Sequence, residues 1–169
     1  MNSIATALDG MNKAISGDPQ KAKAKGAPAS ARLMEGLKFE VTGPRGEKMQ
    51  TDMPPAMGGA ASAPNPGWYM RGSLAACTAT VIAMQAARQG VNLKLLEVTV
   101  ESDSDHRGLL GMDKQVRAGF LAMRMKVKIG ADGVEAAKLR ALVEWGDAHS
   151  PVGCTVRHAP PVGIEVEVV

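Results

Sequence analysis

Apolar residues recur along this chain with two different periods. An amphipathic helix that ends at Gly17 is predicted by residues spaced three or four apart, namely Ile4, Leu8, Met11 and Ile15. The segment that follows, residues 18–30, is polar and basic, which predicts a linker. We therefore expect residues 1–30 to form an N-terminal helix and basic linker, and residues 31–169 to form one domain.

A period of two, typical of strands, begins after the linker and returns in the second half of the chain. Five strands are predicted, over residues 37–41, 48–52, 96–101, 121–129 and 164–168. In the last strand Ile164, Val166 and Val168 alternate with two glutamates. One wet and one dry face per strand is typical of an antiparallel sheet covered by helices on one side.

Three helices are predicted between these strands. Pro66 opens a helix that runs to about Arg88 and ends before Gly90. Asp132, with Glu135, predicts a capping arrangement at the start of a second helix. Ser150 is predicted to cap a short third helix with Pro151 at its first position. The element order β-β-α-β-β-α-β predicts an α+β fold, an antiparallel sheet with segregated helices.

Composition and charge narrow the function. The 169 residues are 45% hydrophobic, with 11 methionines but only 3% aromatic residues, as in a single soluble domain. The net charge of +3 is too small for a nucleic-acid-binding surface, so no nucleic-acid partner is expected. Uncharged stretches are broken by proline or too short to span a membrane. With no secretory signal pattern at the N-terminus, we expect a cytoplasmic protein.

The two cysteines carry the chemistry that the sequence offers. Cys77 lies within the helix that Pro66 opens, and Cys154 lies in the first turn after Ser150. In a reducing compartment, paired thiols are more often catalytic than structural. Both residues can equally be small apolar side chains of a core. The isolated histidines do not have metal-ligand spacing, so no metal and no cofactor is expected.

The motifs around the cysteines resemble those of the OsmC/Ohr family of thiol-dependent peroxide reductases. The resemblance spans roughly residues 32–169 and rests on four segments: Asp52–Gly59, Pro64–Pro66, Leu74–Thr80 and Ser150–Val156. It implies an OsmC-like fold with two central helices in an intertwined homodimer. It further implies active sites at the dimer interface, where a peroxidatic and a resolving cysteine reduce organic hydroperoxides in oxidative stress defence.

Carried over residue by residue, the resemblance gives Cys77 the peroxidatic role. The resolving position is occupied by Ser150, which cannot form a disulfide, and the position of a catalytic glutamate is Gly67. Cys154 lies one helical turn beyond Ser150. Arg71 is a candidate for stabilising the thiolate, as are Arg32 and Arg45, and His149 is a candidate beside the pocket.

Two hypotheses follow from these residues. The first is a thiol-dependent peroxidase, a peroxiredoxin-type oxidoreductase in which Cys77 attacks an organic hydroperoxide. Cys154 or an external thiol reductant would then resolve the sulfenic acid. The second is a non-catalytic OsmC-like homodimer that binds a small apolar ligand in its interface pocket. The changes at Ser150 and Gly67 favour the second hypothesis, and the presence of Cys77 favours the first.

Overall fold

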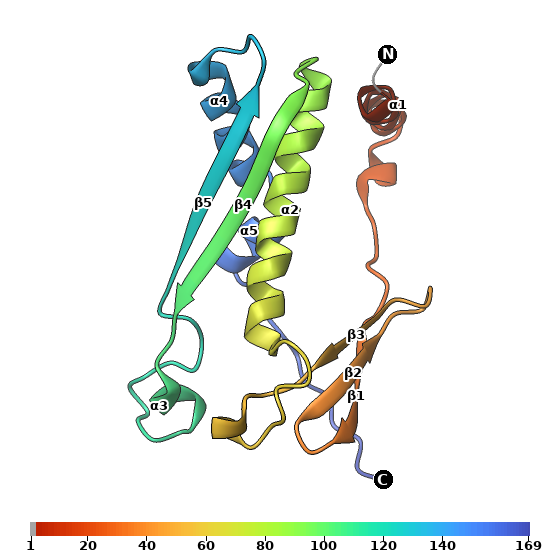
Figure 1. Ribbon diagram of the computed structural model, residues 1–169. Helices are drawn as coiled ribbons and strands as arrows, with labels where there is room; N and C mark the ends of the chain where they lie inside the picture. Colours follow the sequence, from red (N-terminus) through yellow and green to blue (C-terminus); the bar gives the residue numbers. More distant parts are fainter. Residues whose placement is uncertain (1–2) are drawn as a thin grey trace. The chain divides into compact units, whose positions relative to one another are not determined.

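The computed structural model describes residues 3–169, which divide into two compact units between Gly72 and Ser73. Helix α2, Pro66–Arg88, begins in the first unit and continues through the second (Figure 1). The predicted start at Pro66 and end at Arg88 are thereby confirmed. Within residues 3–169 no helix combines the length and apolarity that crossing a bilayer requires.

The first unit contains two N-terminal helical segments and a three-stranded antiparallel sheet. Helix α1, Ser3–Gly17, is followed by a 3₁₀ turn η1, Pro19–Ala22. The strands are β1 (Ser30–Glu35), β2 (Lys38–Thr42) and β3 (Lys48–Thr51), adjacent in that order. The predicted helix and hairpin are confirmed. Strand β1 was not predicted, because its sequence does not alternate and all its residues are exposed.

The loop between β3 and α2 is organised around one carboxylate. Asp52 is only 3% exposed and accepts hydrogen bonds from the backbone N–H groups of Met53 (2.7 Å), Ala60 (3.2 Å) and Ser62 (2.9 Å). The Ser62 hydroxyl donates a fourth, at 2.9 Å. A Cβ at Gly59 would lie 2.0 Å from the Met53 carbonyl oxygen, so the loop leaves no room for a side chain there.

In the second unit, two long antiparallel strands carry one polar and one apolar face. Strand β4, Leu93–Asp103, pairs with β5, Ala122–Ala131. On the polar face Lys128 donates to Glu97 at 3.0 Å. The connector between the strands contains a single short helix α3, His106–Leu109, capped by Asp105. The predicted alternation of polar and apolar faces is confirmed.

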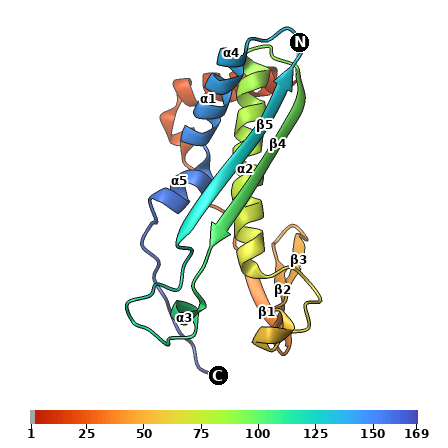
Figure 2. The same ribbon diagram turned by 60° about the vertical axis from the view of Figure 1, so that its left-hand side comes forward.

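Helices α2, α4 (Ala136–Ala148) and α5 (Pro151–Arg157) lie on one side of this sheet (Figure 2). The core between them and the strands is formed by Ile82, Ala86, Val91 and Leu142. Side chains from β4 and β5, including Val98 and Val127, pack against this cluster. The chain is therefore an α+β protein, as predicted.

The helices α2 and α4 approach each other closely at a glycine. A Cβ at Gly146 of α4 would lie 2.3 Å from Cγ1 of Ile82 and 3.1 Å from the Ile82 Cα on α2. Gly146 is buried and Ile82 is fully buried. The absence of a side chain at Gly146 therefore sets how near the two helix backbones come.

Two predictions made from the sequence are wrong. Asp132 does not cap α4, because the cap position is Glu135 and its side chain makes no capping hydrogen bond. The predicted strand over residues 164–168 does not form, since Ile164, Val166 and Val168 are 87%, 76% and 90% exposed. A strand needs a neighbour for its backbone hydrogen bonds, and this segment pairs with neither sheet.

The close contact at Gly146 predicts that one added methyl group at this position destabilises the protein. We expect Gly146→Ala to lower the free energy of unfolding by about 1–3 kcal/mol, because the new methyl overlaps Ile82 and the helices must separate. Gly130→Ala is a matched control, since its Cβ would meet Leu95 at an ordinary 3.7 Å. The control should change stability by less than about 0.5 kcal/mol. Urea unfolding of both variants measures the difference, and equal effects would contradict the close approach.

The Asp52 loop predicts a pH-dependent contribution to stability. The hydrogen bond from the Ser62 backbone is the largest cause that holds the pKa of Asp52 below its ordinary value, with burial opposing it. The ionised Asp52 carboxylate therefore stabilises the folded state fully above the ordinary aspartate pKa of about 4. This stabilisation is lost as the pH falls through the lowered pKa of the folded state. Asp52→Asn should lower Tm at neutral pH, and the gap from the wild type should narrow in acid. Circular dichroism melts measure this, with Asp9→Asn as the surface control; a gap independent of pH would refute it.

Candidate active site

Cys77 lies next to the buried face of α2 but not on it. The buried residues of this helix recur mainly every four positions, as Leu74, Thr78, Ile82 and Ala86. Cys77 is turned by about 100° from Thr78 around the helix axis. Its side chain is accordingly only partly buried. The thiol is therefore neither a sealed core residue nor a fully exposed one.

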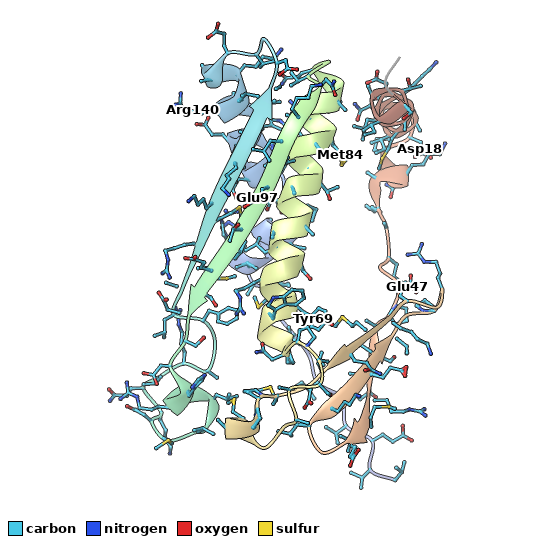
Figure 3. All side chains as sticks on the ribbon, in the orientation of Figure 1. Asp18, Glu47, Tyr69, Met84, Glu97 and Arg140 are labelled. Carbon is cyan, nitrogen blue, oxygen red and sulfur yellow. The ribbon has the colours of Figure 1, made fainter. Side chains whose placement is uncertain are left out.

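The side of α2 that carries Cys77 is not covered by the sheet of the second unit. Met84 follows Cys77 by seven residues, two helical turns, so the two side chains share one face. Figure 3 shows Met84 projecting from α2 away from strand β4. The Cys77 side of the helix is therefore turned away from β4.

Ser150, the capping residue of α5, is hydrogen-bonded to α2. Its hydroxyl accepts from the Gly153 backbone N–H at 3.2 Å and so caps α5, as predicted. It also accepts from the Thr78 hydroxyl at 3.2 Å, and both side chains are fully buried. Ser150 is thus in contact with the residue after Cys77.

Thr78 is a site residue that sequence reasoning missed. Its only signal was a polar side chain four residues from Leu74 and from Ile82, on the stripe that had to be buried. A hydroxyl buried in this way needs a hydrogen-bond partner. The partner could not be identified from the sequence, because Ser150 lies 72 residues further along the chain.

Cys154 and His149 both point outward. Cys154 is exposed on α5, one turn after Ser150, and neither cysteine is in a disulfide. The His149 ring stacks on Trp145 with 3.9 Å between the ring centroids and 10° between the planes. Its Nδ1 lies 2.7 Å from the Trp145 carbonyl oxygen. The structure therefore brings Ser150, and not Cys154, against α2.

The candidate arginines lie in the first unit. Arg71 is on the first turns of α2 and borders a hollow of about 290 Å³ with Asp52 and Trp68. Arg45 is held at the surface by Glu47, with 2.9 Å between Nε and Oε1. Arg32 lies on the exposed strand β1. Arg71 is the one of the three that shares a helix with Cys77.

An apolar cavity of about 420 Å³ lies within the second unit. Its walls come from both strands and three helices and include Leu74, Val100, Met125, Val143 and Val156. Neither cysteine lines it. An ion pair between Arg157 and Asp147, 2.6 Å apart, lies among its polar lining. The cavity has the size and character of a site for a small apolar molecule.

No metal centre is formed by the described part of the chain. Within residues 3–169 no three side chains of His, Cys, Asp or Glu come together as ligands.

Solved structures with similar folds come from several bacteria. An OsmC-like protein from Mycoplasma pneumoniae matches with a TM-score of 0.68 and 14% identity, over 81% of this chain and 91% of that one. The organic hydroperoxide resistance protein OsmC from Legionella pneumophila matches at 0.60 and 23%, over 80% and 93%. An organic hydroperoxide resistance protein from Elizabethkingia anophelis matches with a TM-score of 0.60 and 16% identity, over 81% of this chain and 91% of that one. At these identities the likeness establishes the fold.

Sequence comparison gives the family. No curated protein sequence matches the chain significantly. The family model described as "OsmC-like protein" matches residues 59–165, more than half of the chain, and the match includes Cys77, Ser150 and Cys154. On this match and on the shared fold, the chain belongs to the OsmC-like protein family.

Proposed function

We propose that this protein reduces organic hydroperoxides with Cys77 as the peroxidatic thiol. The observation that carries the proposal is a half-buried cysteine on the side of α2 turned away from strand β4, in a chain of the OsmC-like family. The similar proteins from Legionella pneumophila, Elizabethkingia anophelis and Bacillus subtilis are named organic hydroperoxide resistance proteins. A role in oxidative stress defence follows from this activity.

The proposed reaction begins with the thiolate of Cys77. It attacks the distal oxygen of the hydroperoxide, the O–O bond breaks, and the leaving alkoxide takes a proton to become an alcohol. The cysteine is left as a sulfenic acid. A second thiol then attacks the sulfur, which forms a disulfide and releases water. A further dithiol reduces that disulfide and returns Cys77 to its starting state.

The geometry around Ser150 bears on which thiol resolves the sulfenic acid. Ser150 is the residue of α5 that hydrogen-bonds to α2, and a hydroxyl cannot form a disulfide. Cys154 is exposed one turn further on. These positions favour an external thiol reductant as the resolving partner, with Cys154 as the alternative. Ser150 is then a positioning residue that holds α5 against α2.

Activation of the thiol needs a positive charge, since an ordinary cysteine with a pKa of about 8.5 is mainly protonated at neutral pH. Cys77 is the twelfth residue of α2, too far from the helix N-terminus to gain from its dipole. We propose Arg71, or an arginine from another strand or from the partner subunit, as the stabilising cation, and His149 as a residue beside the substrate. In this proposal the protein is cytoplasmic, in a compartment where cysteines such as Cys77 and Cys154 stay reduced.

Oxidation of the reduced protein by a slight excess of cumene hydroperoxide tests the activity. We expect intact mass spectrometry, without reductant, to show a gain of about 16 Da, one oxygen, that disappears in Cys77→Ser and persists in Cys154→Ser. A loss of about 2 Da would instead mean closure of a Cys77–Cys154 disulfide. Cys154→Ser is the matched control, because it removes the exposed thiol only. An unchanged Cys77 would end the peroxidase proposal.

The alternative function is ligand binding without turnover, in a homodimer with an apolar pocket. It is favoured by the apolar cavity of about 420 Å³ in residues 73–169 and by Ser150 and Gly67 in the family's catalytic positions. If both thiols stayed unoxidised in the peroxide experiment, that result would favour ligand binding over the peroxidase. Oxidation of Cys77 alone would favour the peroxidase.

We also propose that the protein acts as a homodimer. Large apolar side chains are unusually exposed for a lone chain, among them Leu33 (57%), Met34 (53%), Ile164 (87%) and Val166 (76%). A second copy would cover such surface. Light scattering should therefore give a particle of about twice 17.6 kDa at micromolar concentration. A mass of one chain under the same conditions would exclude the homodimer.

A further inference from the structure

The apolar cavity of the second unit is separate from the reaction proposed at Cys77. Its lining residues all lie between Leu74 and Arg157 in the sequence, and they include neither cysteine. The volume of about 420 Å³ is in the range of binding sites for small molecules. No step of the proposed peroxide reduction takes place in this cavity, so it can hold a different molecule.

The walls of the cavity are aliphatic. Its apolar lining consists of leucine, valine and methionine side chains, among them Leu74, Val100, Met123, Met125, Val143 and Val156. Because no aromatic ring is present among these lining residues, a flat ring would find no stacking partner. Met123 and Met125 lie two residues apart on one face of β5, and their flexible thioethers can adapt to the shape of a chain. The walls therefore favour an alkyl chain.

Four charged residues border the cavity, and their ion pairs leave one carboxylate over. Arg124 binds both carboxylate oxygens of Asp103, at 2.5 and 2.9 Å, and Asp103 does not line the cavity. Arg157 is paired with Asp147 at 2.6 Å. Glu144, one turn before Asp147 on α4, is exposed and forms no ion pair with the described residues. The edge of the cavity therefore carries one uncompensated negative charge.

This charge favours a cationic head group on the ligand. A protonated amine at the edge of the cavity would be attracted by Glu144, whereas a carboxylate would be repelled. Because Glu144 is exposed, water screens the attraction, and the expected preference is only about two- to fivefold in affinity. Burial of the alkyl chain contributes more, about fourfold in affinity for each methylene group.

We propose that the cavity binds a primary alkylamine, with its chain against the aliphatic walls and its ammonium group beside Glu144. The proposal rests on the alternative function of ligand binding, and it specifies the ligand class and the place in the second unit. Since neither cysteine lines the cavity, binding there and peroxide reduction at Cys77 are compatible in one chain.

NMR of the full-length protein with isotope-labelled methionine methyl groups tests the site. We expect octylamine to shift the methyl signals of Met123 and Met125 saturably. The signals of Met11 and Met112, which are 59% and 71% exposed and lie outside the cavity, should not move. Octanoate, with a carboxylate head group, should bind about two- to fivefold more weakly. Hexylamine, shorter by two methylene groups, should bind roughly tenfold more weakly.

A substitution of the unpaired carboxylate tests the head group. Glu144→Gln keeps the size of the side chain and removes its charge, so octylamine and octanoate should then bind equally. Glu135→Gln, at the start of the same helix and outside the cavity, is the matched control and should keep the preference for octylamine. A preference that survives Glu144→Gln, or octanoate binding as tightly as octylamine to the wild type, would overturn the proposal. Equal shifts at all methionines, or none at Met123 and Met125, would also overturn it.

The same titration of Cys77→Ser separates this site from the proposed reaction. The affinity for octylamine should be unchanged, because Cys77 does not line the cavity. Lost binding in this variant would place the ligand at Cys77 and contradict the cavity site. The peroxide experiment measures oxidation of the thiols without any amine, so a negative result in one experiment leaves the other unaffected.

Discussion

The contact of α2 with α4 and α5 is the constraint on which the second unit depends. At Ile82 the backbone of α2 comes so close to Gly146 that a methyl group would not fit between them. One turn before Ile82, Thr78 donates its buried hydroxyl to Ser150 at the start of α5. Close packing and a satisfied buried hydrogen bond therefore fix the same helix at two adjacent turns. The strands β4 and β5 pack their apolar face against these helices.

This packing also determines the direction and the exposure of the Cys77 side chain. Because Thr78 faces α5, the side chain of Cys77 is turned away from that contact by the helix geometry alone. It remains partly accessible although the next residue, Thr78, is fully buried. A reactive thiol needs both a fixed position and access for its oxidant, and a residue at the edge of a packed face has both.

Ser150 has two structural roles at the start of α5. A serine at this place caps α5 and accepts the Thr78 hydrogen bond, two tasks that need an oxygen acceptor. The only other thiol of the chain lies one turn further along α5 and faces solvent. The hydrogen bond between the start of α5 and α2 is therefore made by two hydroxyl groups.

The sequence by itself determined the elements whose signals are local. Periodicity, Pro66, Gly17 and the Ser150–Pro151 cap placed the helices, and alternation placed β4 and β5, because these preferences act within a few residues. Tertiary structure decided the rest. Strand β1 exists through its pairing with β2, and residues 164–168 are no strand because no neighbour supplies hydrogen bonds. The meeting of Thr78 with Ser150, and the outward position of Cys154, depend on how helices distant in sequence pack, which no local pattern encodes.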